Sequence, residues 1–395
     1  MTIEQTIEQN KFQADKVAII SAGHSVQDTY QAFLPPLLPI LIEKFALIKT
    51  EAGLLSVFAN LPSLLQPVIG YLADRTGPRY FVILAPAVTA IMMSFLGVAP
   101  TYAVAAILLL VTGISSASIH STGPVIAGRL SAERLGLGMS FWMVGGEIGR
   151  VLGPLVIVGA VEYLQPQNTP WLSVVGILTS VFLYFQLRNF TSLATVREAP
   201  PPWREALKGM RPVLLPVIAI ILSRAFAFVS VSTFLPTYLT ERGANLVMAG
   251  ASLSVMQAAG VAGAFLGGTL SDRLGRRPVL ITAMALSAAA LFAFTSLDGW
   301  VLFPLLLALG FSLLSVAPII MAVVQESFPE SRALANGVYM AVSFVSSSLV
   351  SVMVGAIGDL SGLQTAYYIS AGLALVGLPF VLKLPKGKQK KFSAH

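Results

Sequence analysis

Long apolar runs alternate with short polar segments along the whole chain. Each run is close to the length of about 20 residues that an α-helix needs to cross a bilayer. No soluble fold needs so many segments of this length, so the pattern predicts an all-α integral membrane protein with twelve transmembrane helices. The predicted spans lie at about residues 17–44, 52–73, 80–99, 102–129, 136–160, 171–188, 213–240, 248–271, 278–297, 300–325, 333–357 and 365–383.

A polar segment interrupts this pattern near the middle of the chain. Residues 189–212 include Pro200-Pro201-Pro202 and are too polar to span a membrane and too rich in proline for one long helix. We therefore predict an N-terminal six-helix bundle at 1–188, a cytoplasmic linker at 189–212, and a C-terminal six-helix bundle with a basic tail at 213–395.

Composition agrees with a membrane protein. The chain is 55% hydrophobic and 11% charged, whereas soluble domains carry roughly 25% charged residues. The net charge of +7 does not indicate a nucleic-acid partner, because the basic residues lie in short segments between apolar runs. With the N-terminus inside, the outer loops hold only Lys44, Lys49 and Arg242. We expect a multi-pass protein of the plasma (bacterial inner) membrane, surrounded by lipid, with both termini cytoplasmic.

A charged ten-residue motif occurs twice. Residues 70–79 and 268–277 both read Gly-x-Leu-x-Asp-Arg-x-Gly-x-Arg, at positions separated by half the length of the 395-residue chain. Each copy lies between two apolar runs, so each predicts a tight hairpin between membrane helices. Such a duplication predicts two similar six-helix bundles that face each other around a central cavity.

The doubled motif resembles the major facilitator superfamily of membrane transporters, which carries it between helices 2 and 3 and again between helices 8 and 9. The resemblance implies that both hairpins act as a cytoplasmic conformational latch. The alternative is that their charges only set the topology. The residues concerned are Gly70, Asp74, Arg75, Gly77, Arg79, Gly268, Asp272, Arg273, Gly275, Arg276 and Arg277.

The first predicted span carries a polar stripe. Ser21, His24, Asp28 and Gln31 recur at three- and four-residue steps, which places them on one helix face. An aspartate at membrane depth is costly and normally faces water or a partner. Asp28 is therefore a candidate proton carrier, with His24 and Glu147 as modulators. The alternative is a structural pair in which His24 and Asp28 satisfy each other.

The fifth span combines glycines with two charges. Gly145, Gly149 and Gly153 share one face, which permits close helix packing, and Pro154 follows them. This series resembles the antiporter motif of the superfamily, which implies export. Glu147 and Arg150 lie three residues apart, so they either neutralise each other within the helix or point separately into the cavity.

Arg224 lies well inside the seventh span. No acid lies within one turn of it, so its partner is on another helix or is a ligand. It suits an anionic substrate, because a guanidinium binds phosphate or carboxylate through two hydrogen bonds. Structural pairing with Asp28 or Glu147 is the alternative. The remaining candidates for the cavity are His120, Gln325 and Glu326.

Local patterns resemble the fosmidomycin-resistance efflux branch of the superfamily. They are Gly23-His24-Ser25-Val26-Gln27-Asp28, the stretch from Gly113 to His120, the stretch from Val144 to Pro154, and Gln325-Glu326-Ser327-Phe328-Pro329. The resemblance implies that His24, Asp28, His120 and Glu326 occupy matching positions in the cavity. Glu147 and Arg150 depart from the uncharged residues that the branch implies, so the substrate here need not be the drug that names it.

The sequence contains none of the common motifs of enzymes that would favour an enzyme over a transporter. The chain has no Walker loop, no His-Glu metal spacing and no nucleophile elbow, and it has no cysteine for thiolate ligands. We expect no catalytic residue, cofactor or metal. The predicted function is proton-coupled antiport by a monomer that exports a small organic molecule or drug, with a fosmidomycin-like anion as one candidate. The alternatives are a proton-coupled importer of an organic anion and a transport-inactive receptor or scaffold.

Overall fold

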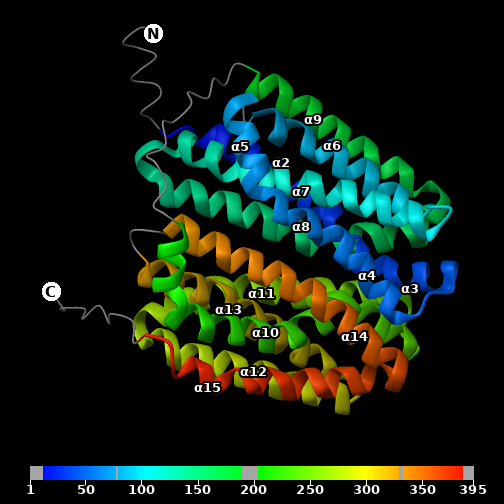
Figure 1. Ribbon diagram of the computed structural model, residues 1–395. Helices are drawn as coiled ribbons and strands as arrows, with labels where there is room; N and C mark the ends of the chain where they lie inside the picture. Colours follow the sequence, from blue (N-terminus) through cyan, green and yellow to red (C-terminus); the bar gives the residue numbers. More distant parts are fainter. Residues whose placement is uncertain (1–11, 77–78, 189–202, 329–331, 386–395) are drawn as a thin grey trace, which may run out of the picture. The chain divides into compact units, whose positions relative to one another are not determined.

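The computed structural model describes residues 12–76, 79–188, 203–328 and 332–385 (Figure 1). These residues are almost entirely helical, and they contain no β-strand. The helices are α2 (Ala14–Gln31), α3 (Leu34–Phe45), α4 (Lys49–Asn60), α5 (Gln66–Thr76), α6 (Arg79–Leu96), α7 (Tyr102–Ser131), α8 (Leu135–Leu164), α9 (Ser173–Leu187), α10 (Trp203–Glu241), α11 (Leu246–Leu274), α12 (Arg276–Ser296), α13 (Leu302–Ser327), α14 (Arg332–Val376) and α15 (Leu378–Val381).

Ten stretches of the described chain are long and apolar enough to cross a membrane. One of them, Gly337–Val381, holds two helices, because Gly362 at φ 85° interrupts α14. The first predicted span is covered by α2 and α3 together. The predicted all-α membrane fold is confirmed, and its twelve helices are consistent with this arrangement.

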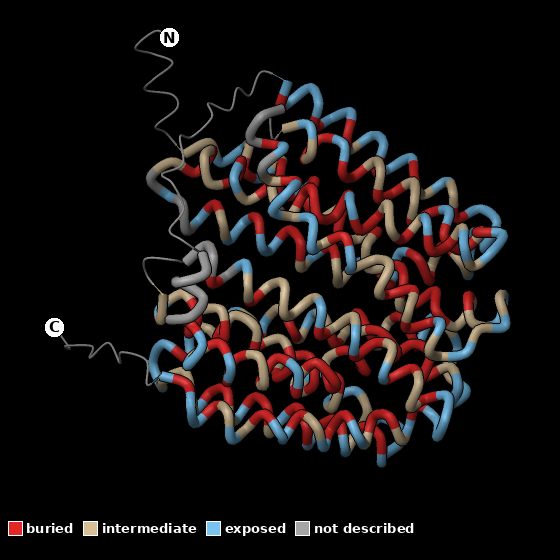
Figure 2. The backbone as a smooth tube through the Cα atoms, in the orientation of Figure 1, coloured by how far each residue is buried: buried red, intermediate tan, exposed pale blue. Residues whose placement is uncertain are grey.

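Large apolar side chains cover much of the protein surface. Leu178, Leu215 and Phe265 are among the exposed ones, and the helices carry buried and exposed stretches on different faces (Figure 2). A soluble monomer rarely exposes apolar patches on this scale. Such a surface is typical of helices that face lipid.

The chain forms two compact units. Unit 1 comprises Met1–Ala46, Leu55–Thr195 and Ala244–Ser254, and unit 2 comprises Leu47–Leu54, Val196–Gly243 and Val255–His395. The start of α4 thus belongs to unit 2 and the start of α11 to unit 1. The division into halves at 188 and 213 stays a prediction.

Each unit has its own apolar core. In unit 1, α2 packs against α6, α7 and α8, and Ile20, Ile83, Ile126 and Leu183 lie in the buried cluster between the helices. In unit 2, the core is formed by α10, α12, α13 and α14. The packing of α2 inside unit 1 determines where its polar side chains lie.

Proline had different effects at two helix boundaries. The span predicted at 17–44 breaks at Ala32–Phe33, ahead of the two prolines that begin α3. By contrast, α10 begins at Trp203 and continues through Pro212, so the last part of the segment predicted as a linker is helical. Met210 and Leu214 are buried in the core of unit 2, and this packing offsets the hydrogen bond that Pro212 cannot donate.

The glycines of α8 allow close contact with α2. A Cβ atom on Gly145, Gly149 or Gly153 would lie 2.3–2.4 Å from a carbonyl oxygen of Ser21, Ser25 or Thr29. Real Cβ atoms do not approach backbone oxygens so closely. The two helices would therefore have to separate if any of these glycines gained a side chain.

We expect Gly149→Ala to destabilise unit 1, because its Cβ would force α8 away from α2. Overpacking costs about 1–3 kcal/mol, which lowers the melting temperature by on the order of 5 °C. Gly159→Ala on the same helix is the control, because a Cβ there meets no atom within 4 Å. Thermal unfolding of the two purified variants tests this, and equal melting temperatures would contradict the packing role.

Candidate functional site

The polar stripe of α2 is buried in unit 1. Nδ1 of His24 lies 2.9 Å from the carbonyl oxygen of Trp142 on α8. Because a carbonyl oxygen can only accept, Nδ1 is the donor of this hydrogen bond. The His24 ring also stacks on the Trp142 indole, with centroids 3.9 Å apart and planes 11° apart. These two contacts fix the orientation of the imidazole and direct Nε2 toward Asp28.

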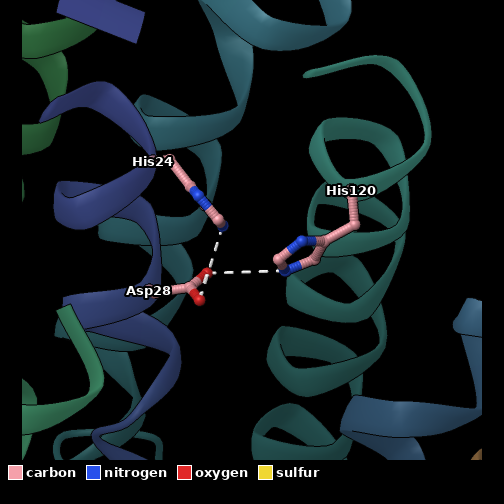
Figure 3. Close-up of side chains that lie close together, drawn as sticks. All are labelled: His24, Asp28 and His120. Atoms are coloured by element: carbon pink, nitrogen blue, oxygen red, sulfur yellow. Dashed lines mark ion pairs between the residues drawn. The ribbon is translucent and has the colours of Figure 1, made fainter. Parts of the chain in front are cut away.

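Asp28 is the centre of a charged cluster, and only 1% of its side chain is exposed. Its carboxylate oxygens lie 3.5 Å from Nε2 of His24, 3.5 Å from Nε2 of His120 and 3.3 Å from Nη2 of Arg150. Figure 3 shows His24 and Asp28 on one helix and His120 facing them from another. Neither carboxylate oxygen has a hydrogen-bond partner among the described residues. The cluster therefore brings together residues from α2, α7 and α8.

Arg150 links two acids within this cluster. Its Nη1 donates to Oε1 of Glu147 at 2.6 Å, while its Nη2 faces Asp28. The Arg150 side chain is 43% exposed, in contrast to the buried aspartate. Arg150 thus pairs with Glu147 within α8 and also reaches across to Asp28 of α2. That either side chain points into a cavity stays a prediction.

Glycine makes room for these side chains. A Cβ atom at Gly146 would lie 2.5 Å from Cε1 of His24 and 3.1 Å from Oδ2 of Asp28. Gln31, the last residue of the stripe, accepts a hydrogen bond from Ser116 of α7 at 2.9 Å. The stripe thus holds α2 against α7 and α8. The sequence does not indicate the contact of His24 with Trp142, because an accepting backbone carbonyl has no sequence signal.

Arg224 belongs to unit 2. Its Nη2 donates to the carbonyl oxygen of Leu313 at 3.5 Å, and its guanidinium lies 5.4 Å from the centroid of the Phe228 ring. It also interacts with the Tyr339 hydroxyl. Its Nε has no hydrogen-bond partner, and no ion pair joins it to an acid in the described part of the chain. Arg224 is a half-buried cation whose described neighbours are neutral groups.

The second copy of the repeated motif forms an ion-pair network. Nη2 of Arg276 lies 2.6 Å from Oδ1 of Asp272 and 2.6 Å from Oε1 of Glu326, and its Nη1 donates to Ser271. The structure thus places Glu326, half-exposed, beside Arg276 of the hairpin. Gly275, at φ 96°, makes the turn before α12, which is a conformation that favours glycine.

The first copy of the motif is described only in part. Arg79 donates to the carbonyl oxygen of Arg188 at 2.6 Å, whereas Gly77 lies outside the described residues. The side chains of Asp74 and Arg75 are likewise not among those the structure describes. Their predicted latch role stays a prediction.

Comparisons with known proteins agree with this architecture. A family model described as Major Facilitator Superfamily matches residues 20–273 and 253–395. The MFS-type transporter YfnC of Bacillus subtilis is 25% identical, over 91% of this chain and 90% of that protein. The fosmidomycin resistance protein of Escherichia coli is 26% identical, over 94% and 93%.

Solved structures share the fold. A bacterial homolog of the human lysosomal transporter Spinster, in an inward-facing and occupied conformation, superposes with a TM-score of 0.78 at 15% identity, over 94% of this chain and 96% of that one. At this identity the likeness establishes the fold alone. Together with the match to the family model, it shows that the chain belongs to the major facilitator superfamily and is a membrane transporter, not an enzyme.

Proposed function

We propose that this transporter exports a small organic molecule in exchange for protons. The observation that carries the proposal is the buried Asp28 carboxylate, whose oxygens face two imidazoles and one guanidinium but accept no hydrogen bond in the described part of the chain. An ionisable residue at membrane depth is a functional candidate by default. This carboxylate can hold a proton, or it can release the proton to water and pair in its ionised form with Arg150.

Exchange requires that proton and substrate disfavour each other's binding. A nearby cation favours the ionised form of a carboxyl group. A substrate that pushes Arg150 toward Asp28 would therefore expel the proton, which produces antiport. An anionic substrate that draws Arg150 away from Asp28 would instead favour proton uptake, which produces the alternative, a proton-coupled importer.

Two further features favour export. The glycines of α8 end in Pro154, in the pattern that resembles the antiporter motif, and a relative that matches nearly the whole chain is named for fosmidomycin resistance. Arg224, without an acidic partner in the described residues, supplies an anion-binding group. It favours an anionic substrate in either direction of transport, so it suits the alternative importer as well. A fosmidomycin-like anion is therefore the first compound to test.

The experiment is transport by the purified protein in proteoliposomes with an imposed pH gradient. Fosmidomycin and a panel of small organic anions and cations would be supplied on one side. We expect at least one compound to move against the direction of proton flow, at a rate that collapses when the gradient is dissipated. Movement with the protons would instead support the importer, and transport that ignores the gradient would contradict proton coupling.

In this proposal both termini lie in the cytoplasm. The two hairpins lie on the same side of the membrane and act as a latch between conformational states. We expect Asp272→Asn to shift the balance between inward- and outward-facing states, by up to about fivefold for an exposed ion pair worth about 1 kcal/mol. The chain has no cysteine, so single introduced cysteines on each face report this balance by labelling. Asp298→Asn, which removes the acid paired with Arg242, is the control. Unchanged labelling by Asp272→Asn would remove the latch role.

A further inference from the structure

The tautomer of His24 creates an unusual contact at Asp28. A neutral imidazole carries one N–H, and the hydrogen bond to Trp142 places it on Nδ1. The Nε2 lone pair then faces Oδ2 of Asp28 at 3.5 Å. Neither this nitrogen nor either carboxylate oxygen has a hydrogen-bond partner among the described residues. Two buried acceptors that face each other repel unless a cation lies near them, and the cation near this pair is the guanidinium of Arg150, whose Nη2 lies 3.3 Å from the same Oδ2.

His120 brings a second imidazole to Asp28 from α7. Its Nε2 lies 3.5 Å from Oδ1 of Asp28, and the three ligand atoms all lie within 4.8 Å of one another. In a tetrahedral site with metal–ligand distances of about 2.0–2.2 Å, ligand atoms lie roughly 3.3 Å apart. The two imidazole rings meet edge to face at 5.0 Å, so they approach the carboxylate from different directions.

We infer that His24, Asp28 and His120 form a binding site for a divalent transition-metal ion such as Zn²⁺. Two imidazoles and one carboxylate suit Zn²⁺ or Co²⁺ better than Mg²⁺ or Ca²⁺, which prefer oxygen ligands. A metal-bound histidine usually donates its other ring N–H to a carboxylate, a backbone carbonyl or water, and His24 donates to a backbone carbonyl. The close approach of Gly146 leaves these side chains room that a Cβ atom would fill.

The charges around the site allow such an ion. With both histidines neutral, Asp28, Glu147 and Arg150 carry one net negative charge. Arg150 competes for Asp28, but it is partly exposed and holds Glu147 at the shorter distance of 2.6 Å. It can therefore stay with Glu147 while a metal ion occupies the position beside Asp28. The two histidines and the aspartate leave a fourth coordination position for water.

The test is a Co²⁺ titration of the purified full-length protein, carrying an affinity tag without histidine. Nitrogen and oxygen ligands around Co²⁺ produce visible absorption bands, and Zn²⁺ should displace them. The chain contains three histidines and no cysteine, so His395→Asn is a matched control for adventitious binding. We expect one Co²⁺ per chain in the wild type and in His395→Asn, and a loss of affinity of about 10–100-fold in His120→Asn.

A second variant changes affinity in the opposite direction. Arg150→Gln removes the competing guanidinium, so it should bind Co²⁺ more tightly than the wild type. Absence of the visible bands in folded wild-type protein would overturn the site. Equal affinity in the wild type and in His120→Asn would also overturn it. A metal ion and the exchanged proton would compete for the Asp28 carboxylate. The titration uses neither substrate nor a proton gradient, so its failure would leave the proposed antiport standing.

Discussion

Asp28→Asn should reduce transport driven by a pH gradient to background while leaving substrate binding measurable. Asparagine has the shape of the protonated aspartate but cannot release a proton, so the coupling between proton and substrate is lost. Arg150 keeps its partner Glu147 in this variant, and no unpaired charge is left in the cluster. The measurement is gradient-driven transport in proteoliposomes beside equilibrium binding of the same compound.

Asp15→Asn is the matched control for Asp28→Asn. Asp15 lies in the first turn of the same helix and is exposed, so its replacement should leave transport unchanged. Gradient-driven transport at the wild-type rate in Asp28→Asn would move the proton site elsewhere. Glu147 would then be the next carboxyl group to replace.

Arg224→Lys should weaken the binding of an anionic substrate by about tenfold or more, although the charge is kept. A hydrogen bond to a charged group is worth about 1.5–3 kcal/mol, and lysine cannot reproduce the planar fork of the guanidinium. Arg224→Ala should weaken binding further, because it removes the charge as well. The measurement is the Kd of the purified protein for a transported anion.

Arg242→Lys is the control for a basic residue next to the same helix. Arg242 follows the last residue of α10 and pairs with the exposed Asp298, so its replacement should not change the Kd. Normal affinity in Arg224→Ala would show that Arg224 is neither a ligand nor an essential partner of one.

Apolar run length and the repeated motif were sufficient to predict the fold. Runs of membrane-spanning length predict helices regardless of their neighbours, and a duplicated hairpin motif predicts two similar bundles. The boundaries near proline depended on packing. The helix α2 ends ahead of Pro35. A different helix, α10, continues through Pro212, because its buried neighbours stabilise it there.

The candidate site could be predicted only along single helices. Four-residue spacing placed His24 and Asp28 on one face, and three-residue spacing placed Glu147 beside Arg150. The approach of His120 and Arg150 to Asp28 depends on how α7 and α8 pack against α2, which local spacing does not determine. For the same reason the sequence did not indicate that Glu326 would pair with Arg276 at the hairpin.

The most direct test of proton exchange is the release of protons when substrate binds. Purified protein in weakly buffered solution would receive the compound identified in the proteoliposome screen, with a pH indicator as the readout. Antiport through Asp28 predicts release of protons by the wild type and none by Asp28→Asn. Proton uptake by the wild type, or equal release by both proteins, would contradict it.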